Sequence, residues 1–428
     1  MIQALIIFII TYALMIALPK WRWLVALISA AVFLVLGVLP LSGVPAAVNW
    51  NVLLMIAGTM GLVALFTESR MPAKLADEII LRVPNEKWAI IALSVFAGII
   101  SAFVDNVATV LMVAPLALTV SKKLKTSPVP AIIAIAIASN LEGSATLVGD
   151  TTSILLGDHA GKNFFDFFWY EGAPGLFFVN QMGLLAATLT LVYRFRHKTQ
   201  KISVSEKTIV TNYIPTVSLI AMIVLLIIAS FANLNSLPVW VQDNINGIIC
   251  FALMLITVLI EIARQRKPEV LPATFKAIDY ETIVLLASLF VVIASIREAG
   301  VIQAIADLFY RVGGSNLFLM YTMIVWASVL LSAFIDNIPY VATMLPVVTS
   351  LAASMAVNPT VLYFGLLIGA TLGGNLTPIG ASANIAGIGI LRKNGYEVSN
   401  KTFMSVSVPY TLSAVTAAYV LVWLVWGI

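Results

Sequence analysis

The chain has 428 residues, of which 61% are apolar and 10% are charged, with a formal net charge of +4. Its mean hydropathy is +1.02, and apolar runs of about 18 residues or more exclude an ordinary soluble protein. These runs are continuously apolar, which favours transmembrane helices over a β-barrel and makes the lipid bilayer the main partner. A single cysteine excludes an intrachain disulfide framework, and the small net charge does not indicate a nucleic-acid partner.

In chain order, two similar sets of elements are predicted. The first, residues 1–194, has spans near 2 to 18, 24 to 40, 51 to 67 and 174 to 194, a long segment at 88–121 and an interrupted one at 129–157. The second, residues 213–428, has spans near 213 to 232, 243 to 263, 281 to 297 and 409 to 427, a long segment at 317–350 and an interrupted one at 360–391. Residues 195–212 form a basic linker, and the first span is expected to be retained rather than cleaved as a signal peptide.

The two sets are an internal repeat. SAFVDN at 101–106 matches SAFIDN at 332–337, an offset of 231 residues, and at the same offset GSATLVGDTTSI matches GNLTPIGASANI. An offset of 230 pairs Glu68 with Glu298 further upstream. Apolar helices aligned by chance do not readily share polar positions, so the repeat indicates two structurally related halves.

The long segments are too long for one upright span. Residues 88–121 as a single helix would measure about 51 Å, against a hydrocarbon core of about 30 Å. Divided at Asp105-Asn106, the segment becomes two limbs that suit a re-entrant hairpin, and Asp336-Asn337 divides 317–350 in the same way.

The positions of basic residues support this topology. If each long segment enters and leaves on one side and the N-terminus is outside, 21 of the 24 Lys and Arg residues lie in inner loops, which agrees with the positive-inside tendency. These loops are 20 to 22, 70 to 87, 122 to 125, 194 to 207, 264 to 276 and 392 to 401. Two full crossings per long segment would give the same parity. We therefore predict an all-α polytopic protein of the cell (inner) membrane with both termini outside. Its fold is an inverted repeat of about ten full transmembrane helices, two re-entrant hairpins and two broken helices.

Asp105 and Asp336 are the first candidate site residues, because an ionised carboxylate within the membrane is expensive. With Asn106 and Asn337 they could bind Na⁺ or a proton at the two hairpin tips. The alternative is that each Asp only caps the helix that follows it, a role that is compatible with ion binding.

The interrupted segments supply the remaining candidates. Small and polar residues there free backbone groups that can face an ion, while the alternative is a kink needed only for packing. The predicted solute-binding or ion-binding residues are Ser139, Asn140, Ser144, Thr146, Gly149, Asp150, Thr151, Thr152 and Ser153 in the first half, and Gly374, Asn375, Thr377, Gly380, Ser382 and Asn384 in the second. No Lys or Arg falls at these breaks, so an anionic solute would be met by helix N-termini and a bound cation.

In these motifs the sequence resembles the ion transporter superfamily, specifically its arsenite permease and sodium/proton antiporter branch, related to citrate-transporter-like permeases. The similarity covers nearly the whole chain. It implies hairpins that open to opposite sides, a site between them lined by 139–153 and 373–384, a homodimer built from scaffold helices and an elevator-like transport domain. In arsenite-type systems it also implies a separate ATPase subunit.

One departure from the family pattern concerns the first break. The family usually has Gly-Asp-Pro-Pro-Asn there, whereas Gly149-Asp150 is followed here by Thr151-Thr152-Ser153, with Ser153 opposite Asn384. A lost amide ligand at this position indicates a divergent substrate.

The predicted function is a secondary active permease for a small inorganic or carboxylate ion, with H⁺ or Na⁺ as the coupling ion and no other cofactor. GDHAGKN at 157–163 lacks the spacing and the Ser or Thr of a phosphate loop, so ATP is not the expected energy source. The alternative is a Na⁺/H⁺ antiporter. A remote alternative, an intramembrane aspartyl protease, conflicts with the sequence before Asp150, which lacks the first Gly of Gly-x-Gly-Asp.

Overall fold

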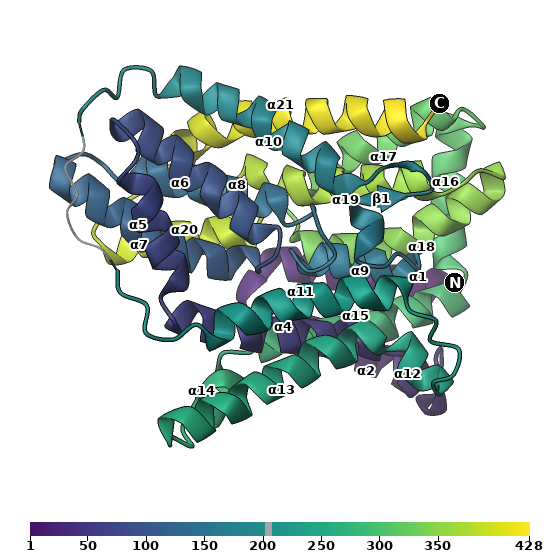
Figure 1. Cartoon of the computed structure of the whole chain (residues 1–428). Helices are drawn as coiled ribbons and strands as arrows, with labels where there is room; N and C mark the ends of the chain where they lie inside the picture. The colour runs from purple at the N-terminus through teal and green to yellow at the C-terminus, as the bar shows by residue number, and fades with distance from the viewer. Residues whose placement is uncertain (202–207) are drawn as a thin grey trace.

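The computed structural model describes residues 1–201 and 208–428, which are almost entirely helical (Figure 1). They form 21 α-helices, and the only strands within them, β1 (Trp169–Tyr170) and β2 (Ala173–Pro174), make a short antiparallel pair. Eight of the described helices are long and apolar enough to cross a membrane. The predicted fold class, a polytopic all-α membrane protein, is confirmed.

The helices fall into the two predicted sets. Those of the first half are α1 (Ile2–Ala17), α2 (Arg22–Val35), α3 (Val44–Ala47), α4 (Trp50–Glu68), α5 (Met71–Ile80), α6 (Glu86–Ser101), α7 (Asn106–Leu124), α8 (Val129–Glu142), α9 (Thr151–His159) and α10 (Leu176–Arg194). Those of the second half are α11 (Ile214–Phe231), α12 (Val239–Asp243), α13 (Ile245–Gln265), α14 (Val270–Lys276), α15 (Tyr280–Glu298), α16 (Val301–Gly313), α17 (Leu317–Ser332), α18 (Asn337–Met355), α19 (Thr360–Gly373), α20 (Ser382–Lys393) and α21 (Asn400–Trp426).

The first long segment is a hairpin of α6 and α7. Both of its open ends contact the segment just before residue 202: the Lys87 N–H donates to the carbonyl of Lys198 (3.0 Å), and Gln200 Nε2 donates to the carbonyl of Leu124 (3.1 Å). The hairpin therefore enters and leaves on one side of the molecule, as predicted. Its tip lies at Asp105, directly before α7.

The second long segment is a hairpin of α17 and α18 that opens to the opposite end. Helix α16 packs against both limbs, and Ser350 of α18 donates to Gln303 of α16. Helix α5 packs in the same way against α6 and α7. Figure 1 places α5 at the left end of the molecule and α16 at the right end, together with both chain termini. The two halves thus have opposite orientations.

The two interrupted segments are broken helices. In the first half α8 ends at Glu142 and α9 begins at Thr151; in the second, α19 ends at Gly373 and α20 begins at Ser382. The breaks coincide with the predicted polar stretches. Each break contacts the turn of the hairpin from its own half through a threonine, as described for the candidate site.

The N-terminal pair of helices differs from the two full spans predicted at 2 to 18 and 24 to 40. Helices α1 and α2 have only 16 and 14 residues, and the chain bends by 114° between them. Pro19 begins the short 3₁₀ turn at this bend, where it has no N–H to donate to a continuing helix. The prediction that residues 20 to 22 lie in a loop at the basic end is wrong for Arg22, whose side chain contacts Asp336 at the tip of the second hairpin.

Helices α4 and α13 form a close contact between the two halves. Each approaches the other through glycine: a Cβ added to Gly58 would lie 2.4 Å from the backbone of Cys250, and one added to Gly247 would lie 2.7 Å from the carbonyl of Asn51. Such close backbone approach is typical of helix packing in membranes. Cys250 is fully buried there.

The inverted topology can be tested at the exposed hairpin ends. We expect Cys at position 122 (Lys122→Cys, end of α7) and at position 354 (Ser354→Cys, end of α18) to react with a membrane-impermeant maleimide from opposite sides of sealed vesicles. The unaltered protein is the control, because Cys250 is buried and should stay unlabelled. Labelling of both positions from one side would contradict the opposed hairpins.

Candidate functional site

Asp105 and Asp336 occupy equivalent positions at the hairpin tips, where each caps the helix that follows. Asp105 Oδ1 accepts hydrogen bonds from the N–H groups of Val107 (3.0 Å) and Ala108 (3.1 Å). Asp336 Oδ1 accepts one from the N–H of Ile338 (3.1 Å). The first N–H groups of a helix have no partner within the helix, and the carboxylates supply it. Capping is therefore confirmed for both residues, and it uses only Oδ1 of each carboxylate.

Each helix break is tied to its hairpin by a threonine. Thr146 donates to the carbonyl of Ala102 in the first half, and Thr377 donates to the carbonyl of Ala333 in the second. Both carbonyls belong to the hairpin turns, where no helical N–H reaches them. The hydroxyls satisfy backbone groups that have no water to bind at this depth.

A second pair of equivalent side chains, Ser153 and Asn384, closes the breaks. Ser153 Oγ donates to the carbonyl of Gly143 (3.0 Å), and Asn384 Nδ2 donates to that of Gly374 (3.1 Å) and of Thr377 (3.1 Å). Ser153 thus makes the bond equivalent to that from Asn384 to Gly374, but makes no bond equivalent to that from Asn384 to Thr377. The predicted correspondence of the two positions is confirmed by these bonds.

Gly149 and Gly380 let each break approach its hairpin turn. A Cβ on Gly149 would lie 2.6 Å from the carbonyl oxygen of Gly143 and 2.9 Å from that of Ser101. A Cβ on Gly380 would meet the carbonyl oxygens of Gly374 at 2.6 Å and of Ala333 at 2.8 Å. Real side chains do not come so close to backbone oxygens, so both positions require glycine.

Buried amides join the two broken helices. Asn140 of α8 donates through Nδ2 to the carbonyl of Thr371 (2.7 Å), and Asn375 donates to the carbonyl of Ile137 (2.8 Å). Asn106 at the first hairpin tip donates to Asn140 Oδ1 (3.0 Å). Asn140 and Asn375 are fully buried. The bonds from Asn140 to Thr371 and from Asn375 to Ile137 run between the halves and hold the breaks side by side.

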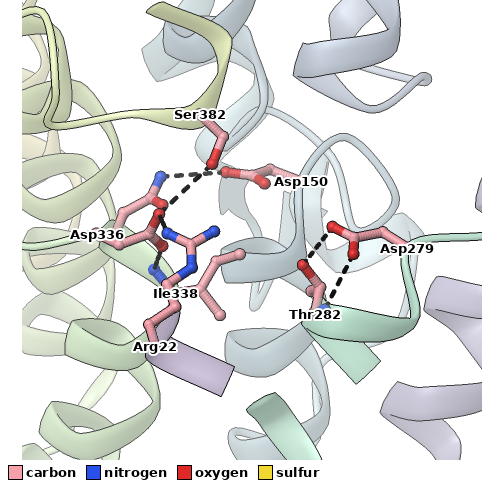
Figure 2. A network of polar contacts seen from close by, with 8 residues as sticks. Arg22, Asp150, Asp279, Thr282, Asp336, Ile338 and Ser382 are labelled. Carbon is pink, nitrogen blue, oxygen red and sulfur yellow. Dashed lines mark hydrogen bonds and ion pairs between the residues drawn. The ribbon is translucent and has the colours of Figure 1, made fainter. Parts of the chain in front are cut away.

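Asp150 links the first break to the second hairpin. Its Oδ1 accepts the N–H of Thr151 (2.7 Å), while its Oδ2 accepts from Thr152 Oγ1 (3.1 Å) and from Asn337 Nδ2 (3.4 Å). Asp150 thereby caps α9 in the way Asp105 caps α7. Figure 2 shows the Asp150 carboxylate pointing toward Ser382 and the tip that carries Asp336.

A cavity of about 370 Å³ lies between the two hairpin tips, the breaks and helices α4 and α15. Its polar lining comprises the predicted residues Asp105, Asn106, Asp150, Thr151, Asn337 and Ser382, together with Thr67, Asp279 and Thr282. Thr67 is near the end of α4 and Asp279 directly precedes α15, so the cavity reaches toward the end of the molecule that holds α5 and α14 (Figure 1). Among its described lining residues three are Asp and none is Lys, Arg or His.

The other predicted residues lie around this cavity rather than in it. Ser139 Oγ bonds to Ser101 (3.0 Å) and to the carbonyl of Asn106 (2.9 Å), which supports the first tip from behind. Ser144 points away, because its hydroxyl accepts from Asn180 of α10 (2.8 Å). Thr152 also approaches Thr371 of the other half (3.2 Å). Ser139 and Thr152 thus position the lining residues Asn106 and Asp150.

Arg22 is the main residue that the sequence prediction missed. Its guanidinium forms an ion pair with Asp336 Oδ2, which Ser382 Oγ also approaches (3.5 Å) (Figure 2). The side chains are 24% and 12% exposed, so the pair is largely shielded from solvent. A basic residue in the short stretch LPKWRW between two apolar runs was the available signal, but it is equally typical of a cytoplasmic loop.

Asp279 and Glu142 were also missed. Asp279 caps α15 through the N–H of Thr282 (3.1 Å), as Asn49 caps α4, so the repeat offset of 230 residues could have pointed to it. Glu142 is fully buried at the end of α8 and accepts from Gln181 Nε2 (2.6 Å), but it is outside the cavity.

A family model described as "Citrate transporter" matches residues 6–369 and, in a second match, 247–427.

Two curated relatives support this match. An uncharacterized transporter of Mycobacterium tuberculosis, MT2759, is 30% identical over 99% of this chain and 98% of its own length. The P protein of Mus musculus is 26% identical over 91% of this chain, but only 56% of its own length is matched.

Two solved structures share the fold. The YdaH transporter of Alcanivorax borkumensis aligns with a TM-score of 0.62 at 14% identity, covering 96% of this chain and 98% of that one. MtrF of Neisseria gonorrhoeae, described as one of a class of antimetabolite efflux pumps, gives 0.53 at 16% identity, covering 87% and 80%. At these identities the likeness concerns architecture alone.

The tight approach at Gly149 can be tested by adding one methyl group. We expect Gly149→Ala to lower the free energy of unfolding by about 1–3 kcal/mol, because the new Cβ would collide with backbone oxygens. Gly389→Ala is the matched control, since a Cβ at Gly389 meets nothing within 4 Å. Thermal unfolding in detergent measures the difference, and equal stability of the two variants would contradict the proposed role of Gly149.

Proposed function

This chain belongs to the citrate transporter family, and we propose that it is a secondary active transporter for a small inorganic or carboxylate ion, coupled to H⁺ or Na⁺. The observation that carries the proposal is the cavity between two opposed hairpin tips and two helix breaks. Its volume of about 370 Å³ is within the range of about 300–1,000 Å³ typical of small-molecule sites. The family membership and the transporters among its relatives exclude the protease alternative.

The acidic lining supports a cation as the coupling ion. Asp105 and Asp150 face the cavity, and a carboxylate in a medium of low polarity is stabilised by a proton or a metal cation. The cavity has no basic lining residue among those described, so an anionic solute would bind together with that cation. The helix N-termini at the tips add partial positive charge.

The transport path follows from the location of the cavity and the basic loops. The end with α5 and α14 carries basic residues such as Arg70, Lys74, Arg264 and Lys276, and by the positive-inside tendency it faces the cytoplasm. The termini would then be extracytoplasmic and the cavity would be open inward. The hairpins and breaks, tied by their hydrogen bonds, would move as an elevator against α4, α13 and α15. A homodimer, and an ATPase subunit as in arsenite-type systems, stay predictions.

A Na⁺/H⁺ antiporter is the second candidate function. The three lining carboxylates of Asp105, Asp150 and Asp279 favour it, since cation exchange needs no further solute. The two functions differ in whether citrate or another anion is required for ion movement.

Transport into proteoliposomes tests the proposal. We expect imposed proton or Na⁺ gradients to drive accumulation of radiolabelled citrate or another small anion, such as sulfate or arsenite. Asp105→Asn should reduce the rate at least about tenfold, because it removes the charge that binds the coupling cation. Asp307→Asn, at an exposed residue of α16, is the control and should keep the rate of the unaltered protein.

The same vesicles separate the two functions. Proton movement driven by Na⁺ alone, with no anion present, would favour the antiporter. If no probe solute moves and no cation exchange occurs, the proposed function is wrong.

A further inference from the structure

The two hairpin tips are equivalent by sequence but differ in their cation environment. Asp336 is paired with the Arg22 guanidinium, whereas no Lys or Arg of the described residues lies within ion-pair distance of Asp105. Both aspartates cap the next helix in the same way, so the difference does not come from local hairpin geometry. The difference comes from the neighbouring residues: Arg22, at the start of α2, lies beside Asp336.

The asymmetry has its origin in the bend between α1 and α2. Helix α2 packs on α15 as α13 packs on α4, so α13, which is uninterrupted, is the counterpart of α2 in the second half. In the first half the chain bends at Pro19, and α2 starts only at Arg22, so the side chain leaves the start of a helix and can reach the cavity region. The first residues of α13, INGIIC, include no Lys or Arg.

The position of Arg22 is supported from both sides. Helix α2 packs along α15, while α1 reaches the second hairpin directly: Tyr12 donates to the carbonyl of Pro339 (2.8 Å) and bonds to Thr343. The bend and these contacts hold the guanidinium against Asp336. A buried carboxylate without a partner carries a large desolvation cost, and the guanidinium offsets it permanently.

We propose that Arg22 is a tethered cation that replaces an external Na⁺ or H⁺ at the second hairpin tip. Only the first tip, with Asp105 and the neighbouring Asp150, then takes a coupling cation from solution. This inference rests on the proposed function and narrows it: the two acidic tips do not imply two coupling cations. The Na⁺ site predicted at Asp336-Asn337 is occupied by the protein's own guanidinium.

The coupling stoichiometry tests this directly. In proteoliposomes, the membrane potential and ion gradients that just stop the flux of radiolabelled citrate give the number of cations moved per citrate. We expect Arg22→Gln to need one more cation per citrate than the unaltered protein, because Asp336 must then find its counter-charge in solution. Arg22→Lys keeps the charge and should keep the original number. The double variant Arg22→Gln/Asp336→Asn removes both charges and should also return to it.

A measurement without transport covers the case in which Arg22→Gln is inactive. In detergent, we expect its thermal unfolding midpoint to rise with added Na⁺ or with falling pH by more than that of the Arg22→Lys variant, because a cation binds the bared Asp336 in the folded state. The double variant should not show the additional rise.

The outcomes separate the two proposals. An Arg22→Gln variant with the original stoichiometry, or with no additional cation-dependent stabilisation if it is inactive, would overturn the tethered cation while leaving the transporter function intact. Absence of any coupled flux in the unaltered protein would instead contradict the proposed function, and the unfolding measurement would still decide the role of Arg22.

Discussion

The structure depends on one constraint: backbone groups inside a membrane must find hydrogen-bond partners within the protein. Two hairpin turns and two helix breaks each release carbonyl and N–H groups where no water competes for them. Asp105, Asp336 and Asp150 satisfy N–H groups at the starts of helices, while Thr146 and Thr377 satisfy the carbonyls of the turns. The polar residues first identified as a binding site therefore also make the irregular backbone possible, and the cavity exists because they do both.

Charge near the cavity is arranged unequally although the backbone is repeated. Of the three cavity-lining carboxylates, Asp105 and Asp150 belong to the first half and Asp279 to the second, while Asp336 at the second hairpin tip is paired with Arg22. The position equivalent to Asp150 is Ala381, an uncharged residue. An inverted repeat can thus keep its backbone architecture in both halves while the charges at its two hairpin tips differ.

The internal repeat made the positions of the hairpin tips and the helix breaks predictable from sequence. Polar matches at one offset located both tips and both breaks, because such residues are rare in apolar helices, and the Ser153–Asn384 correspondence followed from the same alignment. Arg22 could not be found in this way. It lies at a span end, where charge is normally solvated, and only the 114° bend after α1 turns its side chain toward the second hairpin tip. Secondary-structure patterns do not encode the direction of such a bend.

The amide bonds between α8 and α19 have a mechanical consequence. Asn140 and Asn375 each donate to a backbone carbonyl across the boundary between the halves, and Asn106 extends this bonding to the first tip. Separating one break from the other would leave several buried amide groups without hydrogen-bond partners. Separating the two breaks would therefore break several buried hydrogen bonds, so α8, α19 and the first hairpin tip form one connected unit.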